Sequence, residues 1–106
     1  MRALRIIVAT ADAERLRGAL VLASAQAALG GEAALFLQLD AVRLLRAPIS
    51  APEDEAHVRA GLPSLAALLD EAAGLGVTLL ACQTGLALAE MAAGDLPRGV
   101  EVSGPI

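Results

Sequence analysis

The chain has 106 residues, of which 57% are hydrophobic and 19% charged, and its formal net charge is −4. That length suits one domain around a single core, spanning residues 1–106, and the apolar share excludes a disordered chain. Phe36 is the only Phe, Trp or Tyr residue, and the chain has eight arginines and no lysine, so the stacking platforms and basic surface of nucleic-acid-binding proteins are missing.

The first third of the chain predicts a strand followed by a helix. Residues 3–10, ALRIIVAT, are almost entirely apolar and rich in β-branched side chains, which indicates a strand buried on both faces. Thr10 and Asp12 are suitable N-cap residues for an alanine- and leucine-rich helix that continues to about Leu29. The Gly-Gly pair that follows ends this helix.

The middle of the chain is less regular. Residues 33–39, AALFLQL, predict a second buried strand, and residues 40–46 can form a short helical turn. The stretch APISAPEDEAHVRAG, residues 47–61, is the most polar part of the chain and contains two prolines. We expect a mobile loop there that becomes helical near its end, either as an ordinary solvated connection or as a cover over a site.

The last third predicts a helix, a strand, a second helix and a short strand. Residues 64–73 form an amphipathic helix whose apolar face is Leu65, Leu68, Leu69 and Ala72. VTLLA (77–81) predicts a third buried strand, LALAEMAA (86–93) a helix, and GVEVS (99–103) a last strand. Apolar strands that alternate with helices predict an α/β fold, a three-layer α/β/α sandwich with a mostly parallel sheet of about four to five strands.

Cys82 is the only cysteine and lies in ACQTG, between the third strand and the next helix. Two interpretations stay open. Free cysteine is among the most buried residue types, so Cys82 can be a small core residue. As a turn residue beyond the carboxyl end of a strand, it can instead be a nucleophile whose thiolate the helix N-terminus stabilises. Gln83 and Thr84 would then offer hydrogen-bond donors at the mouth, and Gly85 would let the backbone come close.

The sequence shows no evident general base beside Cys82. His57, the only histidine, lies in the 47–61 loop. A Cys-His hydrolase would need this loop to fold over the strand ends, with Asp54 or Glu55 orienting the imidazole. A single cysteine excludes an intramolecular thioredoxin-type cycle, which needs a resolving thiol. What remains is a solitary sulfur suited to a persulfide or a mixed disulfide.

Other classes of site find little support in the sequence. No Cys/His cluster has the spacing of metal ligands, and neither a G-x-G-x-x-G nor a Walker motif is present, so we expect no metal and no cofactor. The apolar segments are too short or too interrupted for a secretory signal or a membrane span, which makes the cytoplasm the expected location. A small-ligand module of flavodoxin-like design ranks last.

These residues resemble the DsrE/DsrF-like sulfur-relay family over nearly the whole chain, especially its small single-domain members related to the DsrE and TusD subunits. The most specific part is ACQTGL, where an apolar strand ends in Ala-Cys and continues through polar residues into an apolar helix. The run from Phe36 to Leu45 and the terminal V-x-V-S-G also match, although relatives often carry glycine where this chain has Ala41.

The resemblance implies an α/β/α sandwich, oligomers of repeated subunits, and a cysteine that accepts sulfane sulfur and passes it to a partner protein. Cys82 is then the catalytic acceptor of a sulfurtransferase-type persulfide carrier, beside Gln83, Thr84 and Gly85 as substrate-binding residues. Sulfur donor and acceptor proteins are the implied partners. The alternative is a non-catalytic oligomeric assembly or small-ligand-binding subunit whose cysteine is inert.

Surplus apolar residues on two helices also predict a homo-oligomer. Each helix has a second apolar strip outside its core stripe, and contiguous exposed apolar patches usually mark contact surfaces. These strips are Leu22, Ala25 and Leu29 on the first helix, and Leu88, Met91 and Ala92 on the 86–93 helix.

Overall fold

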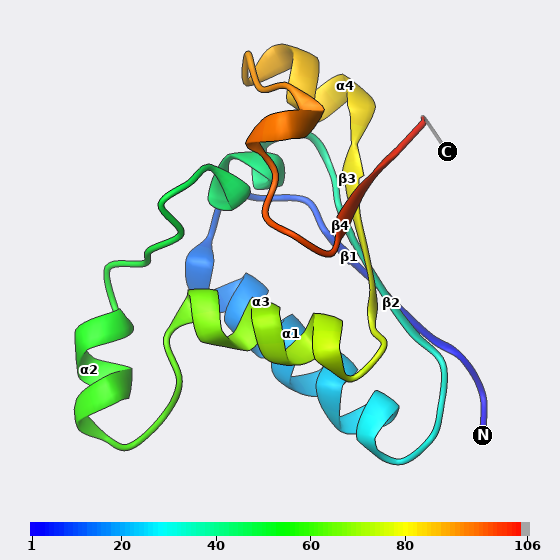
Figure 1. The fold of residues 1–106 in the computed structure, drawn as a ribbon, viewed down its shortest axis with the longest axis vertical. Helices are drawn as coiled ribbons and strands as arrows, with labels where there is room; N and C mark the ends of the chain where they lie inside the picture. The colour runs from blue at the N-terminus through cyan, green and yellow to red at the C-terminus, as the bar shows by residue number, and fades with distance from the viewer. Residues whose placement is uncertain (105–106) are drawn as a thin grey trace.

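Four parallel strands form one sheet in the computed structural model, which describes residues 1–104. The strands lie in the order β1 (Leu4–Val8), β2 (Ala33–Leu37), β3 (Thr78–Cys82) and β4 (Val100–Ser103). The connections contain helices α1 (Ala13–Ala28), α2 (Asp54–Arg59), α3 (Leu65–Gly74) and α4 (Gln83–Leu88), and the 3-10 helices η1 (Leu39–Leu45) and η2 (Ala93–Asp95). Because neighbouring strands are parallel, each connection returns along the sheet before the next strand begins (Figure 1).

The predicted fold class is confirmed. The sheet is parallel with four strands, and the helices that pack around it are consistent with a three-layer α/β/α fold. None of the helices within residues 1–104 combines the length and the apolar character needed to cross a membrane.

Polar caps fix where the two longest helices begin. The Asp12 Oδ1 atom accepts hydrogen bonds from the backbone N–H groups of Glu14 and Arg15, at 3.0 and 3.2 Å. At the start of α3, the Ser64 hydroxyl accepts from the N–H of Ala67 at 3.2 Å. Each cap satisfies donors that a helix N-terminus leaves without an intrahelical partner.

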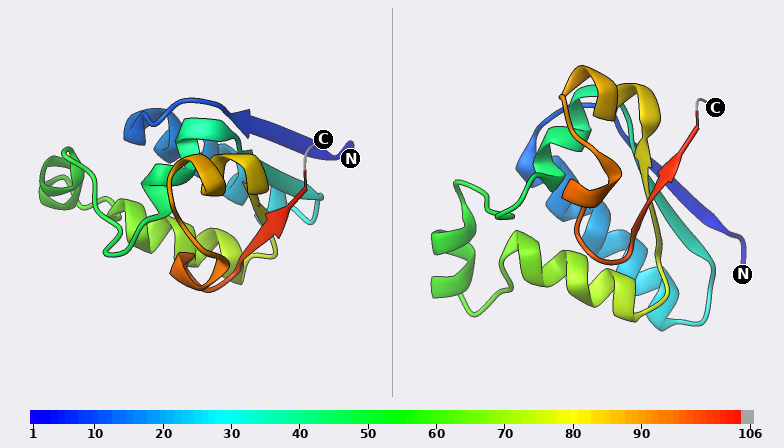
Figure 2. Two further views of the ribbon diagram at one scale, coloured as in Figure 1. Left: turned by 90° about the horizontal axis from the view of Figure 1, so that it is seen from above. Right: turned by 45° about the horizontal axis from the view of Figure 1, so that its top comes forward.

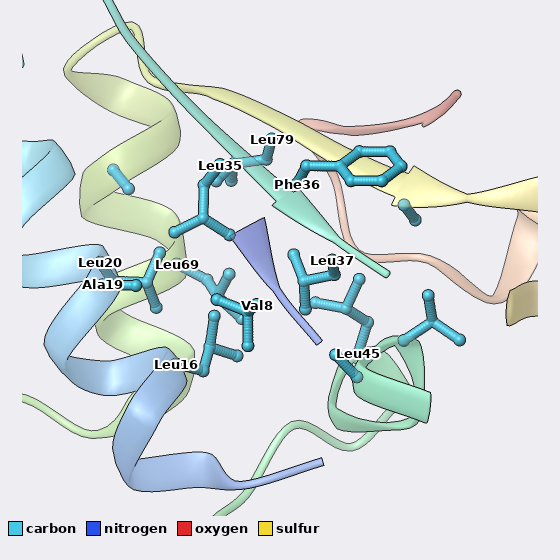
Figure 3. Close-up of a cluster of buried hydrophobic side chains, with 14 of the residues drawn as sticks. Val8, Leu16, Ala19, Leu20, Leu35, Phe36, Leu37, Leu45, Leu69 and Leu79 are labelled. Carbon is cyan, nitrogen blue, oxygen red and sulfur yellow. The ribbon is translucent and has the colours of Figure 1, made fainter. Parts of the chain in front are cut away.

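Aliphatic side chains from one face of the sheet and from α1 and α3 build the core (Figure 3). Leu35 and Leu79 of the sheet are fully buried, as are Leu16 and Leu20 of α1. Helix α1 packs on β1 and β2, and α3 packs mainly against α1. The apolar face predicted for the 64–73 helix is buried as a whole, but α1 is its principal neighbour.

The helices cover the two faces of the sheet unequally. In Figure 1, α1 and α3 lie on one side of the strands. On the opposite face, the side chain of Ile7 in β1 is 66% exposed, and Arg5 is also exposed. The prediction that residues 3–10 form a strand buried on both faces is therefore wrong. β1 is an edge strand of this sheet, and apolar composition alone does not distinguish an edge strand from a central one.

The helix that follows Cys82 starts earlier and ends sooner than the predicted range of 86–93. It stops because Glu90 adopts a left-handed conformation with φ of 56°. The N–H of Met91 then donates to the Leu86 carbonyl at 2.9 Å, which is the bond of a Schellman motif. The chain reverses there and buries Met91, so the prediction that Met91 lies in an outward strip is wrong. The exposed large residues of the two predicted strips are Leu22, Leu29 and Leu88.

Candidate functional site

Cys82 is both the last residue of β3 and the N-cap residue of α4. Its backbone is extended, with φ of −66° and ψ of 125°, and its Sγ accepts a hydrogen bond from the N–H of Gly85 at 3.5 Å. The residue is only 5% exposed. The strand therefore extends one residue further than predicted, and Cys82 is packed as a core residue while its sulfur faces the start of a helix.

Hydrogen-bond donors around the sulfur favour the thiolate. Burial is the largest single influence, and it would by itself raise the pKa of the Cys82 thiol. Hydrogen bonds from the backbone of Gly85, Leu39 and Thr84, and from the Thr84 hydroxyl, together outweigh it and hold the pKa below its ordinary value. Since α4 has only six residues, we attribute the stabilisation of the anion to these directed hydrogen-bond donors and not to a helix dipole.

The 3-10 helix η1 forms the wall against which α4 packs. A Cβ on Gly85 would lie 2.5 Å from the carbonyl oxygen of Leu39, so only glycine fits at this contact. Leu39 itself has a φ of 51°, which is rare for leucine. Leu39 could not be recognised from the sequence, because a leucine that follows a strand does not signal a left-handed turn beside the cysteine of another strand.

The three predicted substrate-binding residues follow the cysteine directly. Gln83 and Thr84 are exposed at the start of α4, whereas Gly85 is buried. Gln83 and Thr84 can therefore meet a molecule that approaches from solvent, and Gly85 contributes its N–H to the sulfur. Their role in binding stays a prediction.

His57 and the acidic residues of α2 do not join Cys82. The Nε2 atom of His57 lies 3.2 Å from Oε2 of Glu14 in α1, and Asp54 binds Arg17 instead of His57. Helix α2 stands well apart from α4 in both views of Figure 2. A hydrolase built from Cys82 and His57 is not assembled in this structure.

Arg17 fastens the segment that contains α2 to the rest of the molecule. Its side chain is buried, and its guanidinium donates to Asp54 Oδ1 at 2.7 Å, to Glu14 Oε1 at 3.0 Å and to the Pro63 carbonyl at 3.1 Å. The expected mobile loop at 47–61 thus contains a helix anchored to α1. The hydrogen bonds described for this segment lead to α1 and α3, so they give no support to a cover over Cys82.

The Asp54 carboxylate is the centre of this anchor. Besides the bond from Arg17, it accepts the backbone N–H groups of Ala51 and Leu65 at 3.0 and 2.9 Å. Partial burial is the largest influence and would raise the pKa of Asp54, but the bonds from Arg17, Leu65 and Ala51 together lower it. The sequence signal for this anchor was a charged residue, Arg17, directly beside the core stripe of α1.

Metal binding finds no support in the part of the chain that the structure describes. Among residues 1–104, no group of three or more His, Cys, Asp or Glu side chains is placed to hold an ion.

Comparison with known proteins identifies the family. The model of the DsrE/DsrF-like family matches residues 3–106. The chain belongs to the DsrE/DsrF-like family. Its members are generally linked to sulfur relay, so the resemblance drawn from ACQTGL is confirmed at the level of the family.

A solved structure supports the fold of this DsrE/DsrF-like chain. MTH1491, a protein of unknown function from Methanobacterium thermoautotrophicum, is 18% identical, and the match covers 97% of this chain and 82% of that one with a TM-score of 0.67. At that identity the likeness shows the fold alone. A search of curated proteins finds no significant match.

Proposed function

We propose that this protein is a sulfur carrier in which Cys82 accepts a sulfane sulfur as a persulfide and passes it to a partner protein. One observation carries the proposal: the hydrogen bonds around Cys82 lower the pKa of its thiol despite burial. The thiolate, and not the thiol, is the nucleophile in such exchange. Membership of a family linked to sulfur relay makes sulfur transfer the natural use of this nucleophile.

Loading is an attack by the Cys82 thiolate on the outer sulfur of a donor persulfide. A new S–S bond forms at Cys82, the S–S bond of the donor breaks, and its electron pair leaves with the donor sulfur as a thiolate. In delivery, the nucleophile of an acceptor protein attacks the outer sulfur, and Cys82 departs as a thiolate. The hydrogen bonds from Gly85, Leu39 and Thr84 favour both steps, because the Cys82 thiolate that they stabilise is the attacking group in loading and the leaving group in delivery.

The surroundings of Cys82 suit the two partners that such a cycle needs. Gln83 and Thr84 are exposed beside the sulfur, where their side chains would hydrogen-bond to an arriving donor or acceptor. A single cysteine used in this way calls for a reducing compartment such as the cytoplasm. The proposal includes a homo-oligomeric assembly, supported by exposed leucines on α1 and α4.

The second candidate is a non-catalytic assembly subunit in which Cys82 is inert. The burial of Cys82 supports this candidate, since a thiol that a sulfur-donor protein cannot reach does not exchange sulfur. The two candidates make opposite predictions about the reactivity of the folded protein.

Mass spectrometry of the intact protein after incubation with glutathione persulfide separates these candidates. The carrier predicts a gain of one sulfur on the wild type, its release by a thiol reductant, and no gain on Cys82→Ser. The Thr84→Val variant tests the hydrogen bonds to the thiolate. It keeps the Cys82 thiol but removes the Thr84 hydroxyl, so it should accept sulfur more slowly than the wild type near neutral pH. No gain on the wild type between about pH 6 and 9 would favour the inert subunit.

A further inference from the structure

We infer that Arg46 is a positioning residue for Cys82, which holds the short helix α4 against η1 and so keeps the hydrogen-bond donors of both elements around the sulfur. As a role in sulfur transfer, this positioning rests on the function proposed above. Its effect on the thiol depends only on the hydrogen bonds and the packing at the two ends of α4.

Helix α4 has few apolar anchors of its own. It contains six residues, of which only Gly85 and Leu86 are buried, and a helix of this length is not stable without tertiary contacts. It contacts η1 more extensively than β3, the strand that precedes it (Figure 2). By contrast, Ala41, Val42 and Leu45 of η1 are fully buried in the core. The position of α4 therefore depends on how it is held against η1.

Two arginines of the η1 segment bind the carboxyl end of α4. The Nη2 atom of Arg46, the residue after η1, donates to the carbonyl oxygen of Ala89 at 2.5 Å, and Nη2 of Arg43 donates to that of Leu88 at 3.5 Å. The last carbonyl groups of a helix lack intrahelical partners and interact favourably with cations. Ala89 is 4% exposed whereas Leu88 is 66% exposed, and a buried carbonyl is the costlier one to leave without a donor. Arg46 is therefore the principal link.

The other end of α4 is where this link affects Cys82. There the N–H of Gly85 donates to the Cys82 Sγ, Thr84 contributes its backbone and hydroxyl, and η1 contributes the backbone of Leu39. Because these donors belong to two elements, they meet at one sulfur only while α4 and η1 keep their spacing. The contact between Gly85 and the Leu39 carbonyl oxygen sets the closest approach, and Arg46 opposes movement of the helix away from η1.

The positive charge of Arg46 has little direct effect on the sulfur. Its guanidinium binds at Ala89, seven residues beyond Cys82, which corresponds to about 10 Å along a helix. That length exceeds the Debye length of about 8 Å at physiological ionic strength. Glu90 and Asp95, which line the same cavity of about 410 Å³ as Arg46, also offset its charge. Arg46 therefore acts on the thiol through the placement of α4.

The test is a titration of the Cys82 thiolate by its ultraviolet absorbance, with Cys82→Ser as the blank. The chain has no Trp or Tyr, so no tyrosinate overlaps the signal, and no reagent has to reach the buried sulfur. Arg46→Met should move the midpoint to higher pH and lower the thiolate fraction below the midpoint by about two- to tenfold, the range expected when one hydrogen bond is lost. Arg46→Lys, which keeps a donor, should recover most of this change. Arg43→Met removes the longer bond and should shift the midpoint less, in the same direction.

Arg59→Met on α2 is the matched control, because this exposed arginine pairs with Glu55 and should titrate like the wild type. Urea unfolding of each variant measures stability separately. If Arg46→Met loses stability but titrates like the wild type, the arginine is purely structural and the inference is overturned. A shift that disappears at high salt also overturns it, since it would be a direct effect of charge.

Loading with glutathione persulfide distinguishes this role from the proposed function. A shifted titration in Arg46→Met, together with a wild type that accepts no sulfur, supports the positioning role and refutes the sulfur carrier. A wild type that accepts sulfur, together with an unshifted titration in Arg46→Met, refutes the positioning role and leaves the carrier in place.

Discussion

Replacing Gly85 by alanine should damage both the stability of the fold and the reactivity of Cys82. The added Cβ would lie 2.5 Å from the Leu39 carbonyl oxygen, about 0.9 Å short of an ordinary contact, and both neighbours are backbone. Forcing such groups apart costs about 1–3 kcal/mol, of which the better helix propensity of alanine returns about 1 kcal/mol. We expect a net loss of up to about 2 kcal/mol in the free energy of unfolding, measured by urea titration.

The same displacement should change the chemistry of the thiol. The Gly85 N–H donates to the Cys82 sulfur, so moving it away raises the pKa of Cys82 and slows alkylation near neutral pH. The matched control is Gly18→Ala in α1, where an added Cβ meets nothing within 4 Å. This variant should gain up to about 1 kcal/mol in the free energy of unfolding, because alanine has the higher helix propensity. If Gly85→Ala is as stable as Gly18→Ala and its thiol titrates like the wild type, the close contact with η1 does not shape this site.

Three further outcomes are expected. Leu68→Ala should cost about 2–5 kcal/mol because Leu68 is buried between α3 and α1, and a loss below about 0.5 kcal/mol in urea unfolding would contradict this packing. Asp54→Asn should lower stability near neutral pH but not in acid. Folding lowers the pKa of Asp54. The ionised carboxylate therefore adds to the free energy of unfolding above the ordinary pKa of about 4, and this stabilisation is lost as the pH falls through the lowered pKa of the folded protein. A difference in urea midpoint between wild type and variant that does not shrink in acid would refute this. Alkylation of Cys82 in the folded protein should titrate below about pH 8.5, and labelling only after denaturation would show an inert thiol.

The alternation of strands and helices could be predicted because it depends on local hydrophobic pattern. The exposure of β1 could not, because an apolar strand has the same composition whether its second face meets a helix, a second chain or solvent. The end of α4 escaped prediction for a different reason. Glu90 takes the left-handed position that glycine usually signals, so no glycine marked the point at which the chain turns and buries Met91.

The candidate site was predictable only as far as one strand and its helix define it. The position of Cys82 followed from ACQTG, but the lowered pKa also depends on Leu39, the first residue of η1, which follows the neighbouring strand β2. Burial alone would raise the pKa of Cys82 and leave a protonated, unreactive thiol. Hydrogen-bond donors without burial would leave an exposed thiolate that dissolved oxidants could reach. The packing of η1 against Gly85 supplies both conditions at once, because it covers the sulfur and brings the Leu39 backbone within reach of it. A relative could therefore keep every residue of ACQTG and still lose the low pKa if the residues of η1 changed the turn after β2.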